Sequence, residues 1–179
     1  SSTVTLSDIV MGTGGNGDTG DIAGIGIRIA SVGTGVLTLN LTGTNTIRST
    51  GQALDVEEVG AGTANNLLLS IDNTTFESAA SGVPSVEITG QNVSTTESSI
   101  GIRSFANNTV IGNGSAGGIL FQAVDFDSDG AGGAVAGGTL NVGQGTGNRV
   151  AGDGVSFIDT TGEIGFTTLN IFNNNGTGL

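Results

Sequence analysis

The sequence repeats one short phrase, and this repetition is the strongest constraint on its fold. In residues 37–47, LTLNLTGTNTI, apolar residues alternate with small polar ones, and a turn of Gly, Thr and Asn leads to a further apolar residue. Related phrases begin at Leu67, Ile100, Thr139 and Thr168. Alternation with a period of two is typical of a β-strand that buries one face. The phrase therefore predicts two short strands joined at a corner, repeated along the chain.

Three series of apolar positions recur in the same order in each repeat. The first series is Ile27, Leu54, Val86, Phe121 and Phe157, with a Gly shortly before each member; the second is Leu39, Leu69, Ile100, Leu140 and Leu169; the third is Ile47, Phe76, Val110, Val150 and Leu179. Positions 27, 54, 86, 121 and 157 are separated by 27, 32, 35 and 36 residues. Repeats of this length indicate a solenoid. Residues 3–6 and 9–11 fit the second and third series, so the N-terminus is expected to form part of a further coil.

Helix is disfavoured throughout the sequence. Gly accounts for 34 of the 179 residues, and each Gly inside a helix costs about 1 kcal/mol relative to Ala. The segment 50–61 is the exception to test, because two Glu residues lie near Ala53 and Leu54. Its apolar positions, Leu54, Val56 and Val59, are spaced as in a strand and a turn.

Three short strands in each repeat predict an all-β fold, a single-stranded right-handed parallel β-helix of about five to six coils that spans residues 1–179 as one domain. Successive coils of such a fold stack at about 4.8 Å, so their inward Ile, Leu, Val and Phe side chains form ladders. Asn residues at the corners are expected to bond from coil to coil. The fourth repeat has the largest number of additional residues. We expect these residues, 125–138, to form a loop inserted between the first and second strand positions.

The phrase LTLNLTGTNTIRSTGQALDVEEV, followed by LLLSIDNTTFESAASGVPSVEITG, resembles a known class of repeats. It is similar to the right-handed β-helix, pectate-lyase-like repeat domains of bacterial surface and secreted proteins, such as autotransporter passenger domains and filamentous adhesins. Gly26-Ile-Arg-Ile29 and Thr75-Phe-Glu77 fit the strand phrases of that class. The resemblance implies a bacterial β-solenoid that is extracellular or on the cell surface. It does not by itself imply an activity.

Charge and composition limit the partners. The formal net charge is −12, and the only cationic side chains are Arg28, Arg48, Arg103 and Arg149. Nucleic acids and anionic membranes are recognised through basic patches, so neither is an expected partner. Divalent cations and basic proteins carry the opposite charge and are compatible partners. The net negative charge also favours solubility. The absence of Cys and His excludes disulfides and Cys/His zinc sites. No apolar run reaches the roughly 18 residues of a membrane-spanning helix, and any signal peptide would lie outside this sequence.

The motif Asp125-Phe-Asp127-Ser-Asp129-Gly130 predicts a calcium site. Carboxylates at alternate positions before a Gly match the first half of an EF-hand loop. The twelfth position holds Ala136 in place of the expected Glu. A Ca²⁺ site would therefore need ligands from a neighbouring coil, for which Asp153 and Asp159 are candidates; the alternative is an exposed acidic turn. A weaker calcium motif, Gly-Gly-Asn-Gly-Asp in residues 14–18 with Asp21, occurs once.

Two further classes of function make specific demands on the sequence. A polysaccharide-degrading enzyme needs carboxylates on either side of the scissile bond, and Asp55, Glu57, Glu87 and Asp125 are the candidates to approach one another across coils. The motifs of polygalacturonases are missing, and Arg28 and Arg103 are expected to be outward charges, so we do not expect an enzyme. Binding to ice or another ordered surface needs a regular array of Thr. The positions assigned to one column hold Thr38, Ser70, Gly101, Asn141 and Asn170, which would break such an array.

The sequence therefore favours a structural or adhesive β-solenoid without catalysis: a surface stalk, a passenger domain or a fibre subunit that presents its loops for contact. The expected partners are a host, cell-surface or glycan ligand and, through the open ends of the coil stack, other copies of the chain in a filament. A segment of a longer chain is the alternative to a stacking subunit. A polysaccharide-binding or polysaccharide-degrading β-helix, dependent on calcium, is the competing function.

Overall fold

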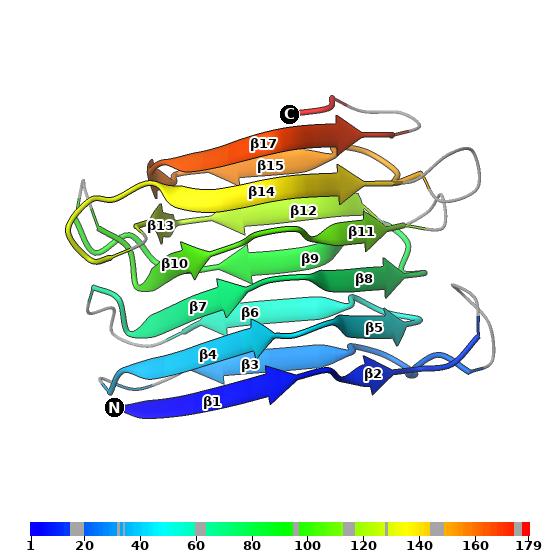
Figure 1. Cartoon of the computed structure of the whole chain (residues 1–179), viewed down its shortest axis with the longest axis horizontal. Helices are drawn as coiled ribbons and strands as arrows, with labels where there is room; N and C mark the ends of the chain where they lie inside the picture. Colours follow the sequence, from blue (N-terminus) through cyan, green and yellow to red (C-terminus); the bar gives the residue numbers. More distant parts are fainter. Residues whose placement is uncertain are drawn as a thin grey trace.

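The structure is a computed structural model, and it describes residues 1–14, 20–31, 33, 35–59, 64–94, 97–112, 117–127, 129–143, 149–173 and 177–179. These residues form seventeen β-strands and no helix. The strands belong to three parallel sheets, and the chain visits the sheets in the same order in every coil (Figure 1). Five coils of three strands are followed by two strands of a sixth. The predicted parallel β-solenoid is therefore confirmed.

The three sheets are named A, B and C in the order in which the chain enters them. Sheet A consists of β1 (Ser2–Ser7), β4 (Leu37–Thr42), β7 (Leu67–Ile71), β10 (Ile100–Ser104), β13 (Val124–Phe126) and β16 (Thr161–Gly162). Sheet B consists of β2 (Val10–Met11), β5 (Asn45–Ser49), β8 (Thr74–Ser78), β11 (Thr109–Ile111), β14 (Val135–Val142) and β17 (Ile164–Ile171). Sheet C consists of β3 (Ile27–Ser31), β6 (Leu54–Glu58), β9 (Pro84–Thr89), β12 (Gly117–Gln122) and β15 (Val155–Ile158).

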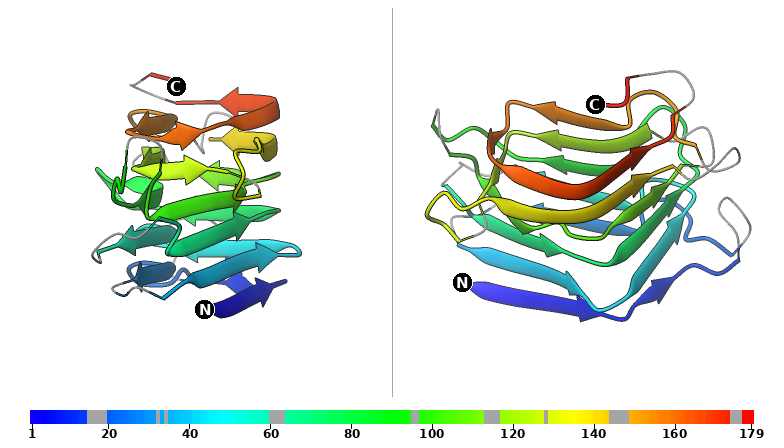
Figure 2. Two further views of the ribbon diagram at one scale, coloured as in Figure 1. Left: turned by 90° about the vertical axis from the view of Figure 1, so that its left-hand side faces the viewer. Right: turned by 45° about the horizontal axis from the view of Figure 1, so that its top comes forward.

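The coil is right-handed. In Figure 1 the long near strands of sheets A and B, such as β4 and β14, point to the right, the far strands of sheet C point to the left, and the chain rises from its N-terminus to its C-terminus. The two further views show the coils stacked one above another around a common interior (Figure 2). All strand pairs within the three sheets are parallel, as the topology requires.

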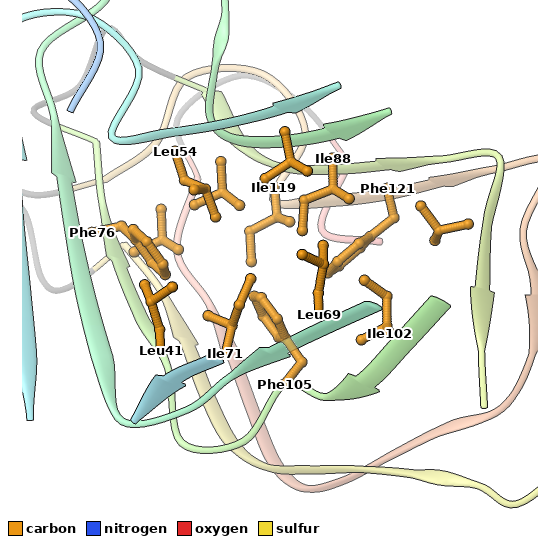
Figure 3. Packing of buried hydrophobic residues seen from close by; sticks show 14 of the residues in the cluster. Leu41, Leu54, Leu69, Ile71, Phe76, Ile88, Ile102, Phe105, Ile119 and Phe121 are labelled. Atoms are coloured by element: carbon orange, nitrogen blue, oxygen red, sulfur yellow. The ribbon is translucent and has the colours of Figure 1, made fainter. Parts of the chain in front are cut away.

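Alternating residues of each strand enter the interior, because side chains of a strand point to opposite faces. The strands β5, β6 and β7 show this as strict alternation between buried and half-buried residues. Inward side chains from the three sheets meet in one apolar core (Figure 3). In the C-terminal half the core is aromatic. Phe121 packs edge-on against Phe105 and Phe126, each at a centroid distance of 5.2 Å, and stacks on Phe157 at 5.4 Å.

A buried polar ladder closes the corner between sheets A and B. Asn45, Thr74 and Asn108 occupy equivalent positions in three coils and are almost completely buried. The backbone N–H of Thr74 donates to Asn108 Oδ1 at 3.0 Å, and Asn108 Nδ2 donates to the carbonyl of Ile71 at 2.8 Å. Asn45 Nδ2 donates to Thr74 Oγ1 at 3.2 Å. The corner Asn side chains therefore bond from coil to coil as expected, with Thr74 between them, and they satisfy backbone groups that the corner would otherwise bury unpaired.

The structure corrects the register of the first two apolar series. Val86 pairs with Ile119, which pairs with Val155; Phe121 and Phe157 lie in the expected strands but two residues further along. In sheet A, Leu69 pairs with Ile102 and not with Ile100. The last two members of the second series were also assigned to the wrong sheet.

Leu140 and Leu169 belong to sheet B, not to sheet A. The strands of sheet A in the last two coils are β13 and β16, which contain three and two residues. The inward positions of sheet B that continue Ile47, Phe76 and Val110 are Val142 and Ile171, in place of Val150 and Leu179. Strands as short as β13 and β16 carry too little alternation to be recognised.

Residues 125–138 are not one inserted loop. Asp125 and Phe126 end β13, and β14 begins at Val135. The chain turns from sheet C into β13 at a single residue, Ala123, whose φ is 48°. The loop lies between β13 of sheet A and β14 of sheet B. It therefore follows the strand of sheet A, whereas the sequence predicted a loop before that strand.

The predictions for the N-terminus and for residues 50–61 are confirmed where the structure describes them. β1 pairs with β4, with Leu6 opposite Leu41, and β2 pairs with β5. β6 is the strand expected at Leu54 and Val56. Residues 15–19 of the Gly-rich turn, with most of the weaker calcium motif, and residues 60–61 lie outside the described residues.

Candidate functional site

The loop after β13 contains two of the three predicted calcium ligands. Asp127 is buried, and its Oδ1 accepts hydrogen bonds from the N–H groups of Asp129 at 3.2 Å, Gly130 at 2.9 Å and Gly132 at 3.2 Å. Asp129 is exposed, and its Oδ1 accepts from the N–H groups of Ala131 at 2.8 Å and Gly133 at 3.3 Å. Both carboxylates therefore hold the loop in shape through its own backbone, as Asp side chains commonly do in turns.

Arg103 compensates the charge of Asp127. Its Nη1 lies 3.6 Å from Asp127 Oδ2, and the same nitrogen donates to the backbone carbonyl of Asp127. Burial raises the pKa of Asp127, but three backbone N–H donors and Arg103 lower it, and the pKa lies below the ordinary value of an Asp carboxyl. The sequence predicts an outward charge at Arg103 and does not predict this partner. The contact joins residues 24 positions apart, so only the correct strand register could have predicted it.

Asp125 points to a different partner. It is buried in β13, and its Oδ1 accepts a hydrogen bond from Thr161 Oγ1 in the next coil at 2.9 Å. The two candidates from neighbouring coils are also separate: Asp153 accepts from the N–H and hydroxyl of Thr177, and Asp159 occupies a corner with a φ of 51°. Among the described residues no three acidic side chains converge as metal ligands. Calcium binding at Asp125, Asp127 and Asp129 thus stays a prediction.

A small cavity lies beside the loop. It measures about 280 Å³ and is lined by Asn65, Glu97, Asp125, Asp127 and backbone of the glycines of the loop. Its acidic lining residues come from two segments, Glu97 before β10 and Asp125 and Asp127 at the end of β13, and Arg103 pairs with Asp127. The hollow is too small for an extended polysaccharide, because pockets for drug-sized ligands begin at about 300 Å³.

A second group of carboxylates lies on the outer face of sheet C. Asp55 pairs in register with Arg28 on one side and Glu87 on the other. Arg28 Nε lies 3.3 Å from Asp55 Oδ2, and Arg28 Nη2 lies 3.3 Å from Glu57 Oε2. Burial, and to a smaller extent Glu57, raise the pKa of Asp55 against the lowering effect of Arg28, and the pKa stays above its ordinary value.

The structure thus brings together three of the four carboxylates considered for polysaccharide chemistry. Asp125, the fourth, lies in sheet A and does not join them. Glu87 also accepts a hydrogen bond from Gln52 Nε2 at 2.6 Å. A carboxyl with a raised pKa beside a second carboxylate is the arrangement that acid catalysis of glycoside cleavage requires. Arg28 occupies one side of this arrangement and reduces the effect.

The outer face of sheet B has a feature that the sequence interpretation missed. Thr46 pairs with Thr75, Thr75 with Thr109, Thr109 with Asn141 and Asn141 with Asn170. The predicted column of Thr38, Ser70, Gly101, Asn141 and Asn170 is wrong, because Asn141 and Asn170 belong to sheet B and Thr38 pairs with Leu68. The observed column of sheet B begins at Val10 and continues with three Thr and two Asn, so a regular array of Thr is absent from it as well.

The fold and these surfaces define a parallel β-solenoid with a braced acidic loop and polar outer faces. Comparison of the chain with protein-family models, with curated proteins and with solved structures finds no match. None of the described segments is a helix of the length and apolarity needed to cross a membrane.

Proposed function

We propose that this chain is a structural segment of an extracellular or cell-surface protein, in which a rigid β-solenoid carries loops toward a partner. It belongs, on this proposal, with the surface stalks, autotransporter passenger domains and filamentous adhesins of bacteria whose repeats its sequence resembles. Catalysis is not part of this role. The partner is a host, cell-surface or glycan ligand.

The observation that carries the proposal is the continuity of the stack. Each of the three sheets runs through all five complete coils, and a single apolar core extends between them. In such a stack each coil is stabilised by its neighbours, so the chain is stiff along the direction in which the coils repeat. Ion pairs between neighbouring coils, Arg28 with Asp55 and Arg48 with Glu77, add lateral links.

The loop after β13 is the element best suited for contact. Its shape is fixed before any partner binds, because Asp127 and Asp129 hold five backbone N–H groups and Arg103 anchors the base. A preorganised loop loses little conformational entropy on binding. Its exposed acidic tip at Asp129 favours a basic partner surface.

End-to-end association into filaments has weaker support than loop presentation. Among the residues that the structure describes, the outer edges of β1 and β17 pair with no strand, and open edges pair readily with other strands. The two end coils differ in shape, however. β1 has six residues where β16 has two, and β2 has two residues where β17 has eight. A second copy stacked end to end would leave much of both edges unpaired.

The scaffold role is tested by stretching the chain between its termini in a force spectrometer. We expect high-force unfolding in steps of whole coils; the coil from Leu54 to Val86 spans 32 residues and would release roughly 110 Å of extended chain. A chain that lengthens smoothly at low force, as an unfolded polypeptide does, would contradict the scaffold role.

Polysaccharide binding or cleavage is the second candidate function, because Asp55, Glu57 and Glu87 share one face of sheet C and the pKa of Asp55 is raised. Incubation with polygalacturonate and with neutral glucans, in the presence and absence of Ca²⁺, tests it. If the site is catalytic, new reducing ends appear and the Asp55→Asn variant forms fewer of them. Equal product from the variant and the wild type would rule out this site.

A further inference from the structure

The loop after β13 contains one of the two Asp-Gly dipeptides in the sequence, and the other directly precedes β15. In Asp129-Gly130 and in Asp153-Gly154 alike, the nitrogen of Gly can attack the side-chain carboxyl carbon of the preceding Asp, because Gly has no side chain to obstruct the approach. The product is a succinimide, a five-membered ring made of atoms from both residues. The surroundings of the two dipeptides differ, and they determine which of the two reacts.

The nitrogen of Gly130 has a base next to it. Its N–H donates to Asp127 Oδ1 at 2.9 Å, which is within the distance at which a carboxylate accepts a proton during catalysis. Asp127 is buried, and Arg103 lies 3.6 Å from its other carboxylate oxygen, so the base has a fixed position. Gly130 is exposed. Outside the adjoining residues, the atom nearest to the point where a side chain would begin is Arg103 Nη2, at 3.5 Å. The ring therefore has room to form.

The carboxyl group of Asp129 is oriented by the backbone of the same loop. Its Oδ1 accepts hydrogen bonds from the N–H groups of Ala131 at 2.8 Å and Gly133 at 3.3 Å. When the nitrogen of Gly130 adds to Cγ, negative charge develops on this oxygen, and the two N–H donors stabilise it as an oxyanion hole does. Asp129 is exposed, so the oxygen that leaves can pass directly into solvent as water.

Asp153-Gly154 has the same sequence but a different partner for its nitrogen. Asp153 Oδ1 also accepts two hydrogen bonds, from the N–H and the hydroxyl of Thr177. The N–H of Gly154, however, donates to the carbonyl of Thr177 at 3.0 Å, and the N–H of Ile119 donates to the carbonyl of Gly154 at 2.9 Å. Gly154 is buried, so attack on Asp153 would break both hydrogen bonds. A neutral carbonyl also cannot take the proton as the carboxylate of Asp127 can.

We infer that Asp129-Gly130 is a site of self-modification, at which the folded chain promotes its own conversion to isoaspartate. In the first step the Gly130 nitrogen forms a bond to Cγ of the protonated Asp129 carboxyl and gives its proton to Asp127. The bond from Cγ to Oδ2 breaks, and the hydroxyl leaves as water with the proton that Asp127 returns. In the second step water opens the ring at the backbone carbonyl carbon of Asp129, and the chain then continues through the former side chain. No atom is oxidised or reduced, and water is the only co-reactant.

Isoaspartate changes the shape of the loop. It adds one methylene to the backbone between Asp129 and Gly130, and it leaves a carboxylate attached directly to Cα. Oδ1 becomes a peptide carbonyl oxygen, so the hydrogen bonds from Ala131 and Gly133 must rearrange. The stacked coils are not involved. The inference rests on the contacts of the loop and is independent of the proposed scaffold role.

The test follows the modification in the whole chain at physiological temperature and pH. Trypsin cleaves after Arg103 and Arg149, so Asp129 and Asp153 fall in separate peptides. The succinimide is lighter than Asp by one water. Electron-transfer fragmentation locates isoaspartate and distinguishes it from deamidation at the Asn-Gly sequences of residues 113–114 and 175–176, which lie outside the described residues. We expect isoaspartate to form at Asp129 at least about tenfold faster in the native chain than in the same chain unfolded in urea, because only the native chain holds the base in place. Asp153 should react more slowly in the native chain than in urea.

The Asp127→Asn variant tests the base. Its amide oxygen can still accept the N–H of Gly130 but cannot take the proton, so the rate at Asp129 should fall at least about tenfold, while the rate at Asp153 stays unchanged. Circular dichroism melting shows whether the variant is folded; if it is not, the comparison of native and urea-unfolded wild type decides alone. Reaction of Asp129 no faster in the native chain than in urea would overturn the inference, and so would a folded Asp127→Asn variant that keeps the wild-type rate.

Discussion

Phe121 is the residue whose removal should reveal most about what holds the coils together. Its side chain is fully buried in β12, and it contacts Phe105, Phe126 and Phe157 at centroid distances of 5.2 to 5.4 Å. Truncation of a buried Phe to Ala costs about 3–5 kcal/mol. That range already includes lost aromatic pairs, each of which contributes about 0.5–1.5 kcal/mol beyond the area that it buries. Because three pairs disappear together, we expect Phe121→Ala to lose about 5 kcal/mol, at the upper end of the range.

Equilibrium unfolding in urea, followed by circular dichroism, measures this loss. With a slope of about 2 kcal/mol per molar urea, the midpoint should fall by about 2.5 M. The matched control is Leu120→Ala, the adjacent residue in the same strand, which faces outward and is only half-buried; its midpoint should fall by less than about 0.5 M. The loss should concentrate in the coils that contain the four Phe residues, since each repeat contacts only its neighbours. A loss below about 2 kcal/mol for Phe121→Ala, or equal losses in the two variants, would refute the view that the four packed Phe side chains hold these coils together.

Three further outcomes are expected. Asn108→Ala should cost about 3 kcal/mol, because the buried N–H of Thr74 and carbonyl of Ile71 lose their partner; a loss under about 1 kcal/mol in urea unfolding would show that water replaces the amide. Asp127→Asn should destabilise the chain at neutral pH but not below the folded-state pKa of Asp127. The folded state lowers that pKa, so its stabilisation is present above the unfolded value and disappears as the pH falls; melting curves with the same difference at pH 2 and pH 7 would contradict this. Ca²⁺ should raise the melting temperature of the wild type but not of Asp129→Ala if the predicted site binds the ion, and a melting temperature unaffected by chelator would exclude it.

The fold could be predicted from the sequence because it depends on a property that many residues share. Any Val, Ile, Leu or Phe at an inward position supports a strand, and the three interleaved series contained enough of them to indicate three strands per coil. The order in which the sheets follow one another then comes from the order of the series. Local rules agreed with this fold throughout, from the low helix propensity of Gly to the Asn residues at the corners.

The register could not be predicted to the same degree. A shift of one residue would turn every apolar side chain outward, but a shift of two keeps the same face buried. Ile119 and Phe121 both point inward from β12, so the sequence offered no reason to choose the correct one. The short strands β13 and β16 hid the last two members of sheet A, and Leu140 and Leu169 were assigned there instead.

This difference between fold and register decides what can be learned about function. The core tolerates a shift of two residues, because one apolar side chain replaces another and burial is unchanged. The outer faces do not tolerate it, because chemistry on a solenoid surface depends on which side chains are vertical neighbours. In the wrong register Asn141 and Asn170 follow Gly101, and no array exists. In the correct register they follow Thr109, and a continuous column of Thr and Asn appears. Arg103 and Asp127 become neighbours for the same reason. Functional inference for a chain of this kind therefore begins with the strand pairing, even where the sequence alone already indicates the fold.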